Sequence, residues 1–298
     1  MTPPRQVIAG DTFEVISRCV HRLFLLAPCP KVRETFLYIL GVYAKKYAIQ
    51  LFALVIMSNH YHLLGKDIRG NLPDFVRDLN AFVARVLNAH RGVKGKFWAG
   101  DGYHIVKPVN PEDVWARLMY ITSNPINADL VSRTQDFPGF VTTPSRIGKT
   151  FTAERPDFFR EGGVMPETAE LTFEVPECFG LSKTEYVARF DRALRDAEHA
   201  AKQRRRTEGK SVVGVKALRN VRHTQMPRSR EKWFKTKGHI ACKCEESRKA
   251  AIAARNAFLN DYREAREEWA EDVSGVVFPH GTWWVCRFAG APARGAPG

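Results

Sequence analysis

Several features that define other classes of protein are scarce in this sequence of 298 residues. Its 6 cysteines are scattered along the chain, which is typical of reduced thiols in a cytoplasmic protein and not of a disulfide framework. The longest uncharged apolar run, residues 51–57, is far shorter than the roughly 20 residues that a membrane-spanning helix needs. No apolar leader segment opens the chain. We therefore expect a cytoplasmic protein that does not enter a membrane.

Acidic residues are also in short supply. The chain has 46 lysines and arginines against 32 aspartates and glutamates, a formal net charge of +14. Residues 201–240 alone contain 13 basic and 2 acidic residues, a net charge of +11. Such an excess favours a polyanionic partner, with nucleic acid ahead of an acidic membrane surface. The hydrophobic content of 44% is nevertheless enough for a packed globular core.

The first part of the chain predicts the element order strand, helix, two strands, helix, strand, helix. Strands are indicated by β-branched and aromatic residues, and helices by apolar residues at helical spacing. Asn110 followed by Pro111 is typical of a helix start, and Pro125 requires that helix to end near residue 124. The order predicts an α+β fold with a ferredoxin-like antiparallel sheet and helices on one face. The segments are 12–27, 34–47, 51–57, 60–65, 71–92, 94–108 and 110–124.

The character of the sequence changes after residue 145. We therefore expect a catalytic domain over residues 1–145 and a basic, mainly helical extension over residues 146–298. The stretch SKTE at 182–185 is a capping box and predicts the start of a helix in this extension. A charged run predicts a linker around residues 202–215.

The stretch VIMSNHYHLL, residues 55–64, puts two histidines one residue apart in an apolar strand. Residues two apart on a strand point the same way, with Cα atoms about 6.5 to 7 Å apart, so His60 and His62 are expected to share a face. Two imidazoles at this spacing can converge on one metal ion, whereas burying both without partners would be costly. The alternative is a pair of hydrogen-bonded structural histidines.

Tyr120 and Asn124 are four residues apart, so we expect them on one face of the helix that follows Asn110. A phenol is a weak nucleophile and needs activation. If Tyr120 faces the two histidines, a bound cation could polarise a phosphate for attack by the phenol, and Asn124 could supply a third ligand. The alternative is an ordinary tyrosine at the rim of the core.

Basic and aromatic residues in three places are candidates for contact with DNA. The segment KGKFWAGDGYH mixes both kinds, as single-strand binding surfaces do. Basic residues near the first strand and in the run after residue 201 would add affinity that depends on salt and not on sequence. The alternatives are a loop anchored by buried rings and a solvated linker. The candidates are Arg18, Arg22, Lys94, Lys96, Trp98, Tyr103, Arg204, Arg205 and Arg206.

The stretch MSNHYHLL, followed about sixty residues later by YITSNPINADLV, resembles the single-tyrosine HUH transposases, in which U is a hydrophobic residue. The likeness is greatest to the REP-associated tyrosine transposases and covers roughly residues 10–140. It implies a HUH endonuclease core in which His60 and His62 bind the catalytic metal and Tyr120 attacks single-stranded DNA. Asn124 stands where some relatives have a glutamine as third ligand. Asp129 stands where glycine is common, and we expect it to affect a turn.

The resemblance also implies what the protein acts on. The family cuts hairpin or palindromic DNA through a 5′-phosphotyrosine, and it uses Mg²⁺ or Mn²⁺, although two imidazoles alone suit zinc, nickel or iron better. No phosphate-binding loop of the G-x-x-x-x-G-K-[ST] type is present. Some relatives form homodimers by exchanging the tyrosine helix, and a bacterial, nucleoid-associated location is implied. Two other functions stay open: a non-catalytic hairpin-DNA-binding protein, and a hydrolase in which the histidines activate water.

Overall fold

The computed structural model describes residues 4–159, 162–229, 238–271 and 273–295. The N-terminal part forms β1 (Asp11–Cys19), α1 (Pro30–Tyr47), β2 (Ile49–Met57), β3 (His60–Asp67), α2 (Leu72–His90) and β4 (Trp98–Pro108). Two short strands join their sheet, β5 (Phe140–Val141) and β8 (Ile240–Ala241). Short 3-10 helices lie at Val20–Arg22, Thr134–Asp136, Pro144–Arg146 and Glu177–Phe179.

These strands form one sheet in the order β5-β2-β3-β1-β4-β8. The four central strands pair antiparallel, and their order with the helices between them is that of a ferredoxin-like fold. The α+β fold class predicted from the sequence is therefore confirmed. β2 and β3 are joined by the Ser58–Asn59 turn, which sets a register with His62 opposite Val55 on one side and Ile16 on the other.

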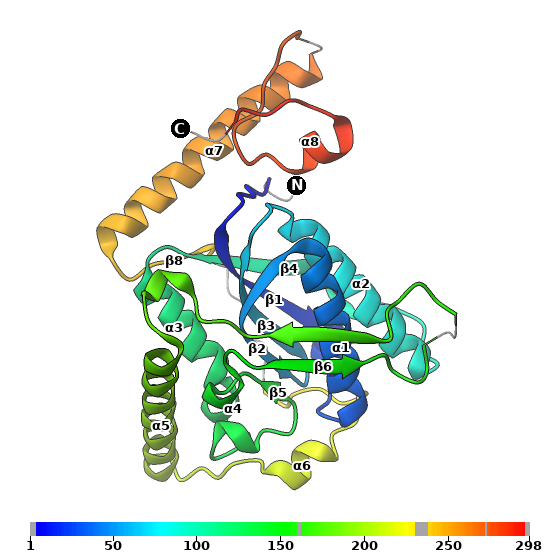
Figure 1. Cartoon of the computed structure of the whole chain (residues 1–298), viewed down its shortest axis with the longest axis vertical. Coiled ribbons are helices and arrows are strands. Elements are labelled where there is room, and N and C mark those ends of the chain that lie inside the picture. The colour runs from blue at the N-terminus through cyan, green and yellow to red at the C-terminus, as the bar shows by residue number, and fades with distance from the viewer. Residues whose placement is uncertain (1–3, 160–161, 230–237, 272, 296–298) are drawn as a thin grey trace.

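Helices cover both faces of the sheet (Figure 1). On one face, Tyr61 of β3 contacts Phe36 of α1 and donates a 2.8 Å hydrogen bond to Asn80 of α2. The side chains of the residues on either side of Tyr61 point to the opposite face, which is covered by α3 (Pro111–Thr122) and the short α4 (Asn124–Asn127). The helices expected on one face are thus α1 and α2, and α3 adds a layer on the other.

The start and end of α3 follow the local sequence signals. The backbone N–H of Asn110 donates to the Asp113 carboxylate at 3.0 Å, and a capping box closes the first turn as predicted. The helix ends at Thr122, close to residue 124 as predicted, but Asn124, which precedes Pro125, opens the short helix α4 and is not excluded from helical structure.

Residues after 145 extend the same core. The hairpin of β6 (Thr150–Glu154) and β7 (Thr168–Thr172) lies directly on α1, where a Cβ added at Gly41 would meet the Ala169 Cβ at 3.0 Å. One continuous hydrophobic cluster includes residues from Phe13 to Leu218. The boundary predicted at residue 145 therefore does not separate two cores.

The linker predicted around 202–215 is helical in its first part. α5 (Lys183–Thr207) continues to Thr207, and residues 208–214 connect it to α6 (Val215–Arg219). The side chains of Tyr186, Phe190 and Leu194 bury one side of α5 against the core. The end of the basic run, residues 230–237, lies outside the described residues.

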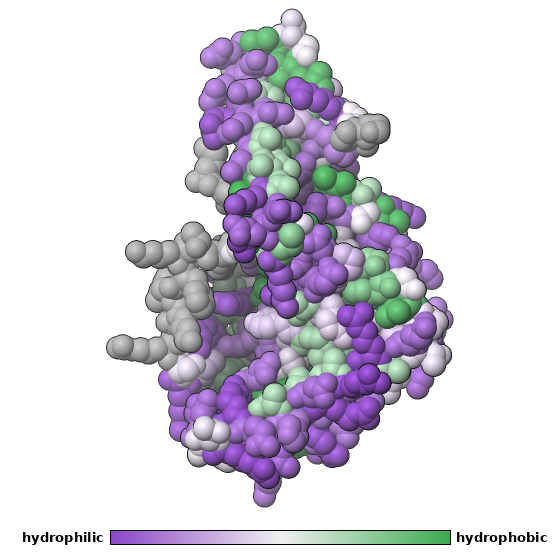
Figure 2. All heavy atoms as spheres, turned by 90° about the vertical axis from the view of Figure 1, so that its left-hand side faces the viewer, coloured by the Kyte–Doolittle hydropathy of each residue, from purple (hydrophilic) through white to green (hydrophobic). Residues whose placement is uncertain are grey.

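The last part of the chain forms α7 (Glu245–Ala270) and α8 (Trp284–Ala289), which share a small hydrophobic cluster around Phe278. α7 rises from β8 past the N-terminal segment (Figure 1), and the face that carries α5 and α7 is mainly hydrophilic (Figure 2). Among the described residues, no helix is both long and apolar enough to span a bilayer.

Phe173→Ala tests whether the residues after 145 belong to the same core. Phe173 is fully buried and stacks on Phe140, so its loss is expected to lower the free energy of unfolding by about 3 to 5 kcal/mol. Urea unfolding of the whole chain measures this. Phe288→Ala, at an exposed phenylalanine of α8, is the matched control and should change stability by less than about 0.5 kcal/mol. Equal effects of the two variants would contradict the shared core.

Candidate active site

His60 and His62 share one face of β3, as their spacing predicts, with ring centroids 5.0 Å apart. Their neighbour strands hold them on both sides, since Met57 of β2 and Arg18 of β1 pair with His60. His62 is only 3% exposed. The pair is therefore presented by a strand in the interior of the sheet, which leaves its side chains little freedom.

Each imidazole is oriented by an oxygen atom at Nδ1. The Glu14 carboxylate lies 2.7 Å from His62 Nδ1, and the Asn59 side-chain oxygen lies 2.7 Å from His60 Nδ1. Both oxygens accept, so Nδ1 of each ring carries a proton and the lone pair is left on Nε2. A carboxylate at the far nitrogen is the usual support of a metal-binding histidine. Both rings are thus set up to bind a metal through Nε2.

The electrostatic surroundings keep His60 neutral. Burial, followed by the neighbouring His62 and the Arg18 guanidinium, lowers the pKa of His60 well below its ordinary value. A neutral imidazole has the free lone pair that metal binding requires.

Tyr120 lies against this histidine pair. Its ring centroid is 5.4 Å from that of His62, in an edge-to-face arrangement. Val114, Leu118 and Ile121 form the buried stripe of α3, so Tyr120 sits at the rim of the core and is 46% exposed. A phenol that contacts a buried imidazole and is also open to solvent can reach a large substrate.

Glu14 and Arg117 complete the site, and the sequence analysis missed both. Glu14 is fully buried on β1 and accepts hydrogen bonds from Arg117 of α3 with the carboxylate oxygen that does not contact His62. The Arg117 guanidinium also lies over the Tyr120 ring, 4.6 Å from its centroid. Glu14 is a lone acidic residue inside the apolar strand TFEVISRC, and this was the signal in the sequence that could have identified it. The two residues connect His62 to Tyr120 through one chain of contacts.

Asn124 is the first residue of α4 and is half-buried. Its side chain has no hydrogen-bond partner in the part of the chain that the structure describes. Among the described residues, no group of three or more His, Cys, Asp or Glu side chains is arranged to hold a metal. The role of Asn124 as a third ligand stays a prediction from the sequence.

The residues proposed for DNA contact in the N-terminal part differ in their surroundings. Arg18 is exposed on β1 directly beside His60, whereas Arg22 donates hydrogen bonds to the backbone and side chain of Ser229. Trp98 donates to the backbone oxygen of Asn80 and packs on Tyr61. Tyr103 is half-buried beneath Arg5. Lys94 and Lys96 are exposed in the α2–β4 connection. Arg18 is thus the candidate that the fold brings to the histidines.

The three arginines at the end of α5 have different roles. Arg204 and Arg205 both bind Asp129, and Arg205 is 5% exposed and donates to the Ile126 backbone oxygen. Arg205 therefore anchors α5 to the turn after α4, which corrects the expectation that it contacts DNA. Arg206 is exposed. Asp129 itself has φ of 54°, a left-handed conformation that explains why glycine suits this turn.

Solved structures that are similar to this chain include two transposases. One is a REP-associated tyrosine transposase bound to a REP hairpin, 17% identical, with a TM-score of 0.42 over 49% of this chain and 84% of the other. Another is a candidate transposase from Deinococcus radiodurans R1, 23% identical, with a TM-score of 0.30 over 42% of this chain and 97% of the other. No protein-family model and no curated protein matches the chain. The candidate site therefore rests on the arrangement of His60, His62 and Tyr120 described above.

Arg117→Met tests the ion pair beneath Tyr120. The change leaves Glu14 buried without its cation, so we expect the free energy of unfolding to fall by about 3 kcal/mol. Chemical unfolding monitored by circular dichroism measures the loss. Arg85→Met removes an exposed arginine that also lies over an aromatic ring, Phe82, and should cost less than about 0.5 kcal/mol. A similar loss in both variants would show that Glu14 does not depend on Arg117.

Proposed function

We propose that this protein is a metal-dependent DNA strand transferase of the transposase type, with Tyr120 as the nucleophile. The observation that supports this best is the contact of the exposed Tyr120 ring with His62, one of two oriented imidazoles on the same strand. The net charge of +14 favours a polyanionic substrate. The motif resemblance adds the substrate class, single-stranded DNA that forms a hairpin.

In the proposed reaction, the Tyr120 oxygen attacks a backbone phosphorus, and the bond between that phosphorus and the 3′ oxygen breaks. The phenol loses its proton and the departing oxygen gains one, so the products are a 5′-phosphotyrosine and a free 3′-hydroxyl. One phosphodiester bond replaces another. The step is therefore reversible, needs no nucleotide cofactor and permits transfer to a second 3′-hydroxyl.

The residues present fit a divalent metal. His60 and His62 would bind it through Nε2, because an oxygen atom already occupies Nδ1 of each ring. Asn124 would add an amide oxygen, and phosphate and water oxygens suit Mg²⁺ or Mn²⁺ for the remaining positions. When bound, such a metal polarises the phosphate and stabilises the charge that develops on it.

Glu14 and Arg117 act as positioning residues in this proposal. Glu14 fixes the tautomer and the orientation of His62. Arg117 places its positive charge over the ring of Tyr120, where negative charge develops as the phenol loses its proton. In this proposal the Glu14–Arg117 ion pair therefore orients both His62, the metal ligand, and Tyr120, the nucleophile.

The nucleophile and the histidines belong to the same chain, because α3 packs on the sheet of its own chain. A single subunit thus supplies every residue of the proposed site. A homodimer that exchanges the tyrosine helix is not needed to complete it. Arg18, exposed beside His60, is suited to contact the phosphate that flanks the cut.

Tyr120→Phe is the decisive variant. Wild-type protein incubated with Mn²⁺ and a labelled single-stranded DNA hairpin, taken from palindromes that flank its own gene, should form an adduct that survives a denaturing gel. Removal of the phenolic oxygen should abolish the adduct completely, and so should chelation of the metal. Tyr43→Phe, at a half-buried tyrosine of α1, is the matched control and should react like wild type.

Other outcomes identify the other functions. Tight binding without any adduct would indicate a non-catalytic hairpin-binding protein. Cleavage that persists in Tyr120→Phe would show that water is the nucleophile and that the protein is a hydrolase.

Glu14→Gln tests the metal site without relying on activity. The amide is a weaker acceptor and carries no charge, so we expect Mn²⁺ affinity, measured by calorimetry, to fall about 10- to 100-fold. Glu177→Gln changes an exposed glutamate that pairs with Lys66, and its affinity should equal that of wild type. Unchanged affinity in Glu14→Gln would contradict the role of Glu14.

A further inference from the structure

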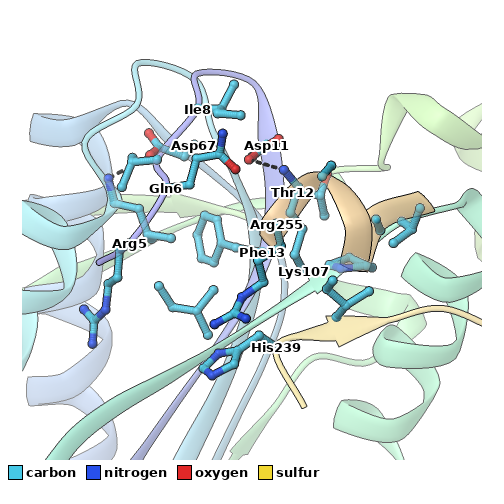
Figure 3. Close-up of a pocket in the computed structure, with 18 of the residues that line it drawn as sticks. Arg5, Gln6, Ile8, Asp11, Thr12, Phe13, Asp67, Lys107, His239 and Arg255 are labelled. Carbon is cyan, nitrogen blue, oxygen red and sulfur yellow. Dashed lines mark hydrogen bonds and ion pairs between the residues drawn. The ribbon is translucent and has the colours of Figure 1, made fainter. Parts of the chain in front are cut away.

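A cavity of about 770 Å³ lies where the N-terminal segment, β4, β8 and α7 meet (Figure 3). Its volume is in the range of roughly 300 to 1,000 Å³ that is usual for small-ligand sites. Arg5, His239 and Arg255 line it, and they come from three separate parts of the chain. In Figure 3 the Arg255 side chain reaches from α7 toward His239. The proposed strand-transfer reaction does not use these groups.

Two of the three lysine and arginine side chains that line this cavity, Arg5 and Arg255, are not paired with a carboxylate of the described residues, whereas Lys107 pairs with Asp11. Arg5 lies over the Tyr103 ring, 3.9 Å from its centroid, and donates a 3.4 Å hydrogen bond to the Tyr103 backbone oxygen. Arg255 forms no ion pair with an acidic side chain among the described residues. Burial and the nearby guanidinium groups, Arg255 more than Arg5, lower the pKa of His239, which is consistent with a concentration of positive charge.

The two acidic side chains of the lining already have partners. Asp11 accepts a 2.6 Å hydrogen bond from Lys107, and the buried Asp67 accepts a 2.7 Å hydrogen bond from the backbone N–H of Leu72. Asp11 is thus paired with Lys107, and neither carboxylate forms an ion pair with Arg5 or Arg255. An anionic ligand, above all a phosphate, suits the guanidinium groups that remain.

Much of the rest of the lining is apolar and partly aromatic, beside polar residues such as Gln6, Thr12 and Asn110. A flat nucleobase packs well on such side chains, and contacts of this kind do not depend on which base is present. A single nucleotide unit combines the two properties that the lining selects, a negative phosphate and a flat ring. The larger apolar residues include Phe13, Leu72, Tyr103, Ile105, Phe258 and Leu259.

The cavity is joined to the active site by one row of side chains across the sheet. His62 of β3 pairs with Ile16 of β1, and Ile16 pairs with His104 of β4, so the three side chains point to the same face. His104 lines the cavity, and its ring centroid is 4.9 Å from that of His239. Two strand spacings of about 4.8 Å each separate His62 from His104. His104 thus reaches the cavity from the face of the histidine pair, whereas Tyr103 and Ile105 reach it from the opposite face, so the cavity lies around the β4 edge of the sheet. A strand of DNA on the histidine pair would enter the cavity at His104.

We propose that this cavity binds one nucleotide of single-stranded DNA beside the phosphate that Tyr120 attacks. Arg255 and Arg5 contact its phosphate, and the apolar wall contacts its base. The inference rests on the proposed function for the identity of the strand. The cavity also gives the C-terminal part of the chain a direct role, because α7 provides Arg255 and the residue just before β8 is His239.

Binding measured in EDTA tests this site separately from strand cleavage. The full chain is titrated against a fluorescently labelled eight-residue oligothymidylate, and anisotropy gives the dissociation constant. Arg255→Gln is expected to weaken binding about tenfold, through loss of one charge-assisted contact, whereas Arg255→Lys, which keeps the charge, should lose less. Arg263→Gln, at an exposed arginine of the same helix outside the cavity, is the matched control and should bind like wild type.

Thymidine 5′-monophosphate, added as competitor, identifies the source of the nucleotide. Displacement of the oligonucleotide from wild type would show that one free nucleotide fills the cavity. If the nucleotide does not displace the oligonucleotide, while oligonucleotide affinity still depends on Arg255, a strand is required. Equal affinities of wild type, Arg255→Gln and Arg263→Gln would overturn the inference. If Arg255→Gln binds the oligonucleotide like wild type and still forms the adduct, the inference about the cavity is overturned while the proposed function is left intact.

Discussion

One buried carboxylate, Glu14, holds the site together. It lies within the sheet, fully buried, with His62 on one oxygen and Arg117 on the other. A carboxylate in that position would cost several kcal/mol if it were unpaired, so the folded state is favoured only when α3 brings Arg117 to it. That requirement sets the position of α3 on the sheet, and Tyr120, one turn further along the helix, meets His62 as a consequence.

The sheet supplies the rigidity that this arrangement needs. β3 is paired on both sides, and Tyr61, between the two histidines, is fixed on the opposite face by Phe36 and Asn80. A shift of the register by one residue would turn the histidines into the α1–α2 core, which packing forbids. Side chains on such paired strands are held more precisely than side chains on loops. The side that faces α3 is thus free for chemistry.

The residues after 145 reinforce this core and enlarge the surface beside it. Arg204 and Arg205 of α5 hold Asp129, so the turn after the tyrosine helix is anchored from outside the ferredoxin-like unit. β8 pairs with β4 and brings α7 to the edge of the sheet. The same extension therefore stabilises the segment that follows Tyr120 and lines a cavity at the β4 edge of the sheet.

The sequence by itself determined the features that depend on neighbouring residues. The shared face of His60 and His62 follows from strand periodicity, and the start of α3 follows from the Asn110 cap. Only the tertiary structure decided the rest. Glu14 and Arg117 are 103 positions apart in the sequence. The neighbouring side chains of Arg205 and Arg206 are distinguished only by burial, since Arg205 is buried against the turn after α4 and Arg206 is exposed to solvent. Pairings at such separation are chosen by how the sheet and helices pack, and no local periodicity records them.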